Sequence, residues 1–445
     1  MHDSYWMPFT ANRQFKNNPK ILSSARGIYY FTGNQKILDG MSGLWCCNLG
    51  HARTEIASAV NQQINNLDYA TAFQLGHNTA FELANKLVEL SNQSPSTNNL
   101  KNVFFCNSGS EAVDTSLKVA LAYHKANGQP QRTILIGREK GYHGVGFGGM
   151  AVGGLENNKK QFLPLLPNVE HLPHLLDIDK NSFSKGSPKH GIEKADHLEF
   201  LIEKHGADNI AAVIVEPFSG SAGVIIPPLG YLQRLREITK KYGILLIFDE
   251  VISGFGRVGA LFAAQRWGVQ PDMIIMAKGL TNGVIPMGAV MIDGAIYNKL
   301  MQGDEKYIEL FHGYTYSGHP VACAAALACL KIYQDENIFA QSIELENYWQ
   351  EKLHSLKGLP NIIDIRNIGL AGAIEFKPPT PELVGLYAYN IFDYCFKNGL
   401  LVRHTGDMIA LSPPLVINKA EIDFMINILA DAIKQSNDLS NPHKI

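Results

Sequence analysis

Strand patterns and helix patterns alternate along the chain from about residue 101, and this alternation limits the possible folds more than any other feature. A strand at 103–106 is followed by a helix at 110–127, where apolar side chains recur at helical spacing. Further strands are predicted at 133–136, 210–215, 244–248, 273–276 and 288–292. Most are continuous apolar runs, as expected for strands buried on both faces. The sequence therefore predicts an α/β fold with a mostly parallel sheet covered by helices.

The length and a change in composition predict more than one domain. The 445 residues are enough for two or three domains of roughly 100–200 residues each. After Gly318 the chain continues with a small-residue helix pattern at 321–330 and a long helix pattern at 339–356. We expect an N-terminal segment at 1–50 that joins the small domain, a large domain at 51–317 and a smaller α+β domain at 318–445.

Charge and cysteine content exclude several classes of protein. Lys and Arg total 39 and Asp and Glu total 41, so the net charge is −2, and neither nucleic acid nor a membrane surface is an expected partner. The first residues lack the basic start and apolar stretch of a signal peptide, which predicts a cytoplasmic protein. The six cysteines show no C-x-x-C spacing, so neither a metal site nor a disulfide framework is expected.

One lysine stands in an otherwise uncharged segment. Residues 273–292 contain a single charged side chain, Lys278, directly after a predicted strand. Burial lowers the pKa of a lysine amine and makes it available for Schiff-base chemistry. A lysine that reaches the surface from a loop is the alternative interpretation.

A strand at 244–248 delivers Asp249 and Glu250 at its carboxyl end, where open α/β sheets bind ligands. Asp249 could hold a cationic group such as a protonated pyridine nitrogen, coordinate a metal, or act as the aspartate of a nucleotide-binding site. The last role needs a phosphate loop, and no Gly-Lys dipeptide occurs in the chain. A P-loop NTPase is therefore excluded.

Two glycine-containing stretches are candidates for contacts with a cofactor. Ser108, Gly109 and Ser110 join a strand to a helix, whose free N–H groups can bind a phosphate; an ordinary helix cap is the alternative. The stretch at 141–149 matches G-x-G-x-x-G from Gly144, but no strand runs directly into it and no clear helix is predicted after it, so a dinucleotide site is disfavoured. Its Tyr142 offers a ring that could stack on a planar cofactor.

An activatable lysine, a strand-end aspartate, a phosphate-binding helix start and a stacking aromatic ring together indicate pyridoxal 5'-phosphate (PLP). This cofactor needs a Schiff-base lysine, a carboxylate at its pyridinium nitrogen, a phosphate site and a platform for its ring. The combination is more specific than any of its members.

With these residues in place, the chain resembles the class III (ω-) aminotransferases of PLP fold type I. The most diagnostic segment is I-F-D-E-V-I-S-G-F-G-R at 247–257, followed by Lys278 at 29 residues after Asp249. The segments W-M-P-F-T-A-N-R-Q-F at 6–15, G-L-W at 43–45 and H-G-Y-T-Y-S-G-H-P at 312–320 are similar to the β-alanine (ω-amino acid):pyruvate aminotransferase branch.

The resemblance implies a role for each residue of the cofactor site. Lys278 would bind PLP and move the proton, and Asp249 would keep the pyridine nitrogen protonated. Residues implied to contact the cofactor elsewhere are Ser108, Gly109, Ser110, Tyr142, His143, Glu216 and Val251. Tyr314 and Thr315 would reach the phosphate of the neighbouring subunit, which implies a homodimer with shared active sites, with a tetramer as the alternative.

The resemblance also implies a substrate pocket and a reaction. Pocket positions are Phe9, Trp45, Phe73, Tyr142 and Ser221, and Arg403 matches an arginine that pairs with a substrate carboxylate. Cys46 and Cys47 are departures that could alter the pocket. The implied reaction moves an amino group from an ω-amino acid such as β-alanine to pyruvate. Alternatives on the same fold use a diamine or 4-aminobutyrate, or use S-adenosylmethionine in the biotin pathway.

Overall fold

A seven-stranded sheet forms the centre of the molecule. The computed structural model describes residues 4–378, 380 and 383–438. The strand order is β4-β10-β9-β8-β7-β5-β6, in which β5 to β9 run parallel and β10 is antiparallel to both of its neighbours. The strands are β4 (Leu100–Cys106), β5 (Ile134–Arg138), β6 (Val169–Leu172), β7 (Ile210–Val215), β8 (Leu245–Asp249), β9 (Met273–Met276) and β10 (Gly288–Asp293). The predicted α/β fold with a mostly parallel sheet is confirmed.

Helices cover both faces of this sheet. Leu245 and Ile247 of β8 pack into a core with α5, whereas Leu246 and Phe248 of the same strand pack into the core on the opposite face. On the first face lie α5 (Gly109–Ala126), α6 (Phe147–Val152) and α12 (Gly294–Leu300); on the second lie α4 (Asn78–Ser91), α9 (His197–His205), α10 (Tyr231–Lys241) and α13 (Pro320–Asp335). Burial on both faces explains why these strands are apolar throughout.

Two four-stranded sheets complete the fold. One has the order β1-β2-β3-β13, and its strand β3 near the N-terminus pairs in parallel with β13 near the C-terminus. The other is antiparallel with the order β11-β12-β15-β14. The strands are β1 (Ser24–Arg26), β2 (Tyr29–Thr32), β3 (Gln35–Asp39), β11 (Ile362–Ile368), β12 (Ala371–Phe376), β13 (Leu400–Leu401), β14 (Arg403–Thr405) and β15 (Met408–Leu411).

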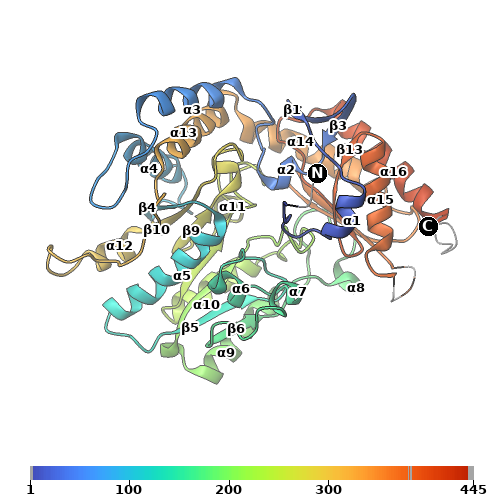
Figure 1. Ribbon diagram of the computed structural model, residues 1–445. Coiled ribbons are helices and arrows are strands. Elements are labelled where there is room, and N and C mark those ends of the chain that lie inside the picture. Colours follow the sequence, from blue (N-terminus) through green and yellow to red (C-terminus); the bar gives the residue numbers. More distant parts are fainter. Residues whose placement is uncertain (1–3, 379, 381–382, 439–445) are drawn as a thin grey trace.

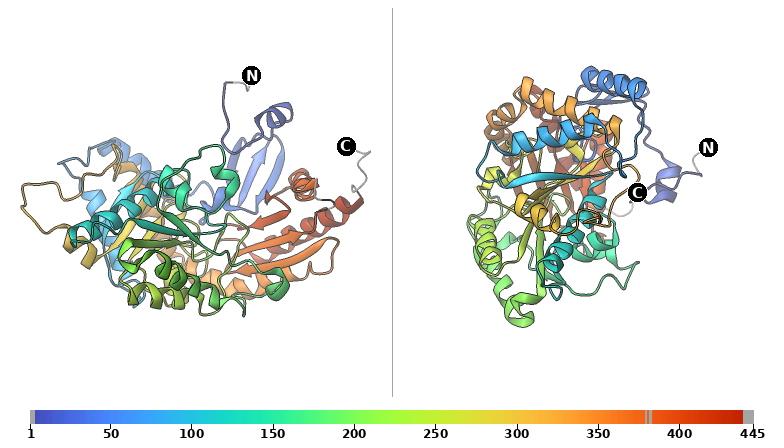
Figure 2. Two further views of the ribbon diagram at one scale, coloured as in Figure 1. Left: turned by 90° about the horizontal axis from the view of Figure 1, so that it is seen from below. Right: turned by 90° about the vertical axis from the view of Figure 1, so that its left-hand side faces the viewer.

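The C-terminal helices pack around these smaller sheets. Helices α14 (Ile338–His354), α15 (Leu386–Lys397) and α16 (Lys419–Asp438) lie with β1 and β3 at one end of the molecule (Figure 1). In the left view of Figure 2 the red C-terminal helices and the blue helices near residue 80 lie at opposite ends of the molecule. The remaining helices are α1 (Asn12–Asn17), α2 (Ser42–Trp45), α3 (Thr54–Asn66), α7 (Glu156–Lys159), α8 (Ile178–Asn181), α11 (Ala263–Trp267) and the 3₁₀ turns η1 (Ile192–Asp196), η2 (Ala207–Asn209) and η3 (Lys278–Leu280).

The glycine-rich stretch at 141–149 differs from its prediction. A short helix, α6, begins inside it at Phe147, where the sequence indicated no clear helix. A Cβ atom at Gly148 would lie 2.6 Å from Oδ1 of Asp114 on α5, and the backbone N–H of Gly149 donates to the same oxygen at 2.8 Å. These glycines allow α6 to pack closely against α5, which explains the motif without a dinucleotide.

Among the residues that the structure describes, no helix combines the length and the apolar character needed to cross a membrane.

Candidate active site

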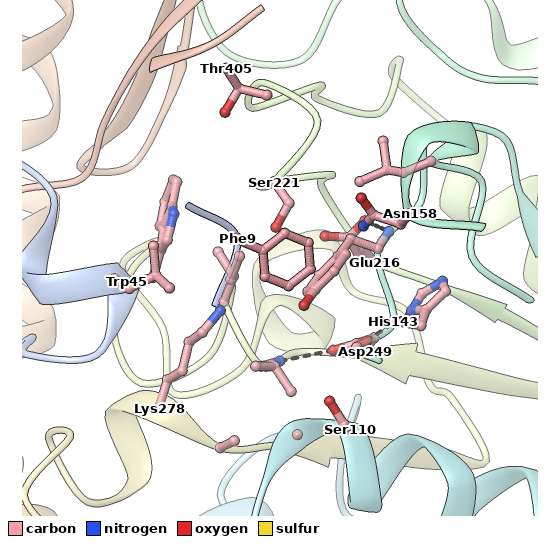
Figure 3. A pocket seen from close by; sticks show the side chains of 18 of the residues that line it. Phe9, Trp45, Ser110, His143, Asn158, Glu216, Ser221, Asp249, Lys278 and Thr405 are labelled. Carbon is pink, nitrogen blue, oxygen red and sulfur yellow. Dashed lines mark hydrogen bonds and ion pairs between the residues drawn. The ribbon is translucent and has the colours of Figure 1, made fainter. Parts of the chain in front are cut away.

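A pocket of about 480 Å³ opens at the carboxyl ends of the central strands (Figure 3). Glu216 directly follows β7, Asp249 ends β8, and Lys278 follows β9 by two residues, so neighbouring parallel strands bring all three side chains to one edge of the sheet. Segments from the N-terminal region and the β14–β15 hairpin form the opposite wall. The pocket therefore lies where open α/β sheets bind their ligands.

Lys278 lies at the floor of this pocket. It begins η3 with a φ of 46°, a left-handed conformation that is uncommon for a residue with a side chain. The side chain lines the pocket and is otherwise surrounded by protein atoms, and this burial lowers the pKa of its amine. The nearby charge of Arg403 lowers that pKa further, whereas Asp249 opposes the effect. A neutral amine is nucleophilic, so the position suits Schiff-base chemistry.

Asp249 is a buried carboxylate held by two groups of its own chain. Its Oδ2 lies 2.8 Å from Nδ1 of His143, and its Oδ1 accepts a hydrogen bond from the backbone N–H of Val251 at 3.2 Å. Only 5% of the Asp249 residue is exposed. With Asp249 ionised, Nδ1 of His143 carries the proton, so the histidine fixes the orientation of the carboxylate toward the pocket.

Helix α5 points its first turn at the pocket. Gly109 and Ser110 line the cavity, whereas Ser108 caps the helix by accepting a hydrogen bond from the backbone N–H of Glu111 at 3.2 Å. A Cβ atom on Gly109 would lie 3.0 Å from a methyl group of Val251. The 18-residue helix thus presents free N–H groups at a site that a larger residue would narrow.

Tyr142 and Glu216 are held together beside the floor. The backbone N–H of Tyr142 donates to Oε1 of Glu216 at 3.0 Å. Burial, together with the charge of Asp249, raises the pKa of Glu216 to about 6. The bond fixes the Tyr142 backbone, and its ring lines the pocket.

These groups fit PLP. A lysine amine of lowered pKa, a buried carboxylate, a helix N-terminus with room for a phosphate and a pocket-lining tyrosine are the four supports that this cofactor needs. Lys278 would hold the cofactor covalently, Asp249 would face its pyridine nitrogen, and Gly109 and Ser110 would bind its phosphate. These groups fit PLP better than they fit the metal or the dinucleotide considered in the sequence analysis.

The upper part of the pocket is suited to a small substrate. Phe9, Trp45, Ser221 and Thr405 lie there (Figure 3), and Arg403 also lines the pocket. Burial lowers the pKa of Arg403, and among the residues that the structure describes, no carboxylate forms an ion pair with its guanidinium. Arg403 is therefore free to bind a carboxylate that enters the pocket.

Besides Ser108, three predicted site residues lie outside the pocket of their own chain. Phe73 is 56% exposed and packs beside Gly313, and Thr315 is exposed. The hydroxyl group of Tyr314 donates to the carbonyl oxygen of Glu111 at 3.1 Å, on the outer side of α5. The structure of one chain thus leaves Phe73 and Thr315 exposed, where a second chain could use them, whereas Tyr314 is partly buried against α5.

The sequence did not reveal every residue of the pocket. Further lining residues are Leu44, Val113, Gly144, Leu155, Asn158, Ile252, Ala277, His404, Thr405 and Gly406. Asn158 belongs to the short helix α7, which lies in a polar stretch without helical periodicity. The contact between His143 and Asp249 joins residues 106 positions apart, and no local pattern marks it.

Comparison with known proteins agrees with this site. A family model described as aminotransferase class-III matches residues 10–433. The chain is 52% identical over 434 residues to an omega-aminotransferase of Caulobacter vibrioides, covering 97% of this chain and 98% of the relative. It is 46% identical over 440 residues to a beta-alanine–pyruvate aminotransferase of Pseudomonas aeruginosa, covering 97% and 95%.

A solved structure extends the agreement to the fold. The amine transaminase from an uncultivated Pseudomonas species, in its PLP-bound form, superposes with a TM-score of 0.91 at 34% sequence identity, covering 98% of this chain and 99% of that chain. The match spans the central sheet, the pocket and the smaller sheets together. The chain belongs to the class III aminotransferase family.

Proposed function

We propose that this protein is a PLP-dependent ω-amino acid:pyruvate aminotransferase. The observation that carries the proposal is that Lys278 and Asp249 line the same pocket, together with Arg403 on the substrate side. The relatives that share 52% and 46% of its residues support the choice of ω-amino donors and of pyruvate. β-Alanine would give up its amino group and leave as a semialdehyde, and pyruvate would then receive that group and leave as alanine.

Each step assigns a task to a residue of this chain. PLP, when bound, supplies the electron sink that stabilises negative charge on the substrate carbon. Lys278 would take a proton from the substrate carbon and deliver it to the carbon of PLP that is bonded to the same nitrogen, which its lowered pKa favours. Asp249 would keep the pyridine nitrogen of PLP positively charged, and His143 keeps the carboxylate in place. Arg403 orients the substrate carboxylate.

The direct test is the visible absorption of the purified protein after PLP has been supplied. β-Alanine should remove the absorption band of the bound cofactor, and pyruvate should restore it. A band that responds to diamines or to 4-aminobutyrate but not to β-alanine would retain the enzyme class and change the donor. Failure to bind PLP would contradict the proposed function.

Replacing Arg403 with alanine should raise the KM for pyruvate by about 10- to 100-fold, because a hydrogen bond to a charged group contributes about 1.5–3 kcal/mol. Amines that lack a carboxylate should lose much less, since they do not use the guanidinium. Steady-state kinetics with pyruvate and with an uncharged amine measure both effects. The exposed Arg26 provides the control as Arg26→Ala. Equal losses for both kinds of substrate would contradict a carboxylate-binding role.

The active assembly is proposed to be a homodimer. Thr315 and the apolar residues near it, Phe73, Phe311 and Tyr316, are exposed on one chain, which is unfavourable for so many large side chains. Light scattering should give twice the mass of the chain, or four times if dimers pair. An active monomer would contradict shared active sites.

A cytoplasmic location, predicted from the sequence, also belongs to this proposal. Fractionation of the producing cells tests it: activity in the extracellular fraction would contradict the prediction.

A further inference from the structure

The loop at 216–225 forms part of one wall of the pocket. It leaves β7 after Val215, reverses direction, and closes through paired backbone hydrogen bonds between Ser219 and Ile225 at 2.9 and 3.0 Å. Glu216 at its beginning and Ser221 at its tip both line the pocket. Any movement of the tip would therefore move a residue of the substrate side.

A buried arginine holds each end of this loop. At its base, Arg138 donates to the carbonyl oxygen of Glu216 at 2.6 Å and to Oγ of Ser219 at 3.0 Å. At its tip, Nε of Arg366 donates to the carbonyl oxygen of Gly223 at 2.7 Å. Arg138 belongs to the central sheet, whereas Arg366 belongs to β11 of the C-terminal sheet, so the tip depends on a separate part of the fold.

Arg366 is fixed by more than its bond to the loop. Its two terminal nitrogens donate to Asp364 at 2.7 Å and to Glu375 at 2.6 Å, and the residue is 5% exposed. The planar guanidinium offers donors in a fixed fork, so the two carboxylates orient the third donor toward Gly223. The carboxylates also neutralise a charge that would otherwise be costly to bury.

Strand register places Arg366 and Arg403 in one row of the same sheet. Arg366 pairs with Ala373, Ala373 pairs with Ala410, and Ala410 pairs with Arg403. Directly paired residues point to the same face of a sheet, so both arginines face the pocket side. Arg403 reaches the cavity directly, and Arg366 reaches the loop that forms its wall.

The loop fits closely against this face. Gly223 has a φ of 109°, and a Cβ atom there would lie 2.6 Å from Sδ of Met408 and 2.8 Å from Nη2 of Arg366. Phe218 and Val224 of the loop share a small core with Ala373, Ala410 and the pocket residue Trp45. Packing and hydrogen bonding thus join the sheet, the loop and the pocket in one unit.

We propose that Arg366 is a positioning residue for the substrate side of the pocket. It holds the 216–225 loop, and with it Ser221, in a fixed position relative to Arg403. The inference rests on the proposed aminotransferase function, because Ser221 affects turnover only if substrates enter this pocket. Arg366 acts through the loop and contacts no substrate.

The test compares Arg366→Lys with a matched control, Arg132→Lys. Lysine keeps the charge between Asp364 and Glu375 but cannot reproduce the fork to the loop. Arg132 is also 5% exposed and donates to the carbonyl oxygens of Ala207 and Ile210, but it lies at the opposite end of β7 from the pocket. Its replacement should weaken the fold without moving the loop.

Two readouts decide the proposal. Amide hydrogen exchange of the peptide spanning 216–225 should become faster in Arg366→Lys than in the wild type and the control. The ratio of kcat/KM for a short donor to that for a bulky amine should change by about threefold to tenfold in Arg366→Lys only, in the range of measured couplings between contacting residues. If Arg366→Lys does not fold, Gly223→Ala disturbs the same contact from the loop side and should give the same two changes.

The proposed function and the positioning role of Arg366 can be contradicted by different results. A wild-type protein that does not transaminate would overturn the proposed function, while hydrogen exchange would still decide the role of Arg366. Unchanged exchange at 216–225 together with an unchanged donor ratio, in a variant that folds, would overturn the positioning role.

Discussion

Replacing Lys278 with alanine should lower the rate of transamination by about 10⁴-fold, the upper end of what a positioned acid–base group contributes. No other lysine lines the pocket among the described residues, so no second amine could take over the proton transfer. Steady-state kinetics with β-alanine and pyruvate measure the loss. The fold should survive, because alanine removes a costly buried amine and leaves η3 in place.

A control and a second readout separate chemistry from folding. Lys240→Ala, at an exposed position on α10, should retain full activity. Borohydride reduction should attach PLP covalently to the wild-type peptide that contains Lys278 and not to the variant. Transamination by Lys278→Ala at a rate near that of the wild type would disprove the catalytic assignment.

The sequence was informative wherever function depends on local order. Asp249 and Lys278 follow uninterrupted apolar strands, and parallel strands must bring their carboxyl ends to one edge, so their meeting in one pocket could be expected from the pattern alone. Ser110 could be expected there as well, because a helix start directly follows β4. These predictions needed only the direction of the strands.

Contacts between distant segments could not be predicted in the same way. Three contacts join residues from 106 to several hundred positions apart. They are the hydrogen bond between His143 and Asp249, the pairing of β3 with β13, and the hydrogen bond from Arg366 to Gly223. Side-chain geometry decides such contacts, and composition or periodicity does not encode it. The glycine-rich stretch at 141–149 shows the same limit, since its glycines serve packing against Asp114 of α5.

Replacing Asp249 with asparagine should lower kcat by about 10²- to 10³-fold, the usual cost of removing a preorganised electrostatic group. Asparagine keeps the shape of the side chain and loses its charge, so positive charge on the pyridine nitrogen of PLP would no longer be stabilised. It also replaces one acceptor oxygen with a donor, so either His143 or the backbone N–H of Val251 loses its acceptor. Kinetics of each half-reaction, measured with PLP bound, should show the loss for both the donor and pyruvate.

The adjacent strand supplies the matched control for this variant. Asp272 immediately precedes β9 at the opposite end of the sheet, where it accepts hydrogen bonds from Arg236 and from the backbone of Leu246, each at 2.7 Å. Asp272→Asn should therefore lower the melting temperature while leaving kcat near the wild-type value. If Asp249→Asn behaved in the same way, losing stability but not kcat, the carboxylate would be structural. A large loss of kcat in Asp249→Asn, a smaller loss in His143→Asn and none in Asp272→Asn would place the electrostatic role on Asp249 and the positioning role on His143.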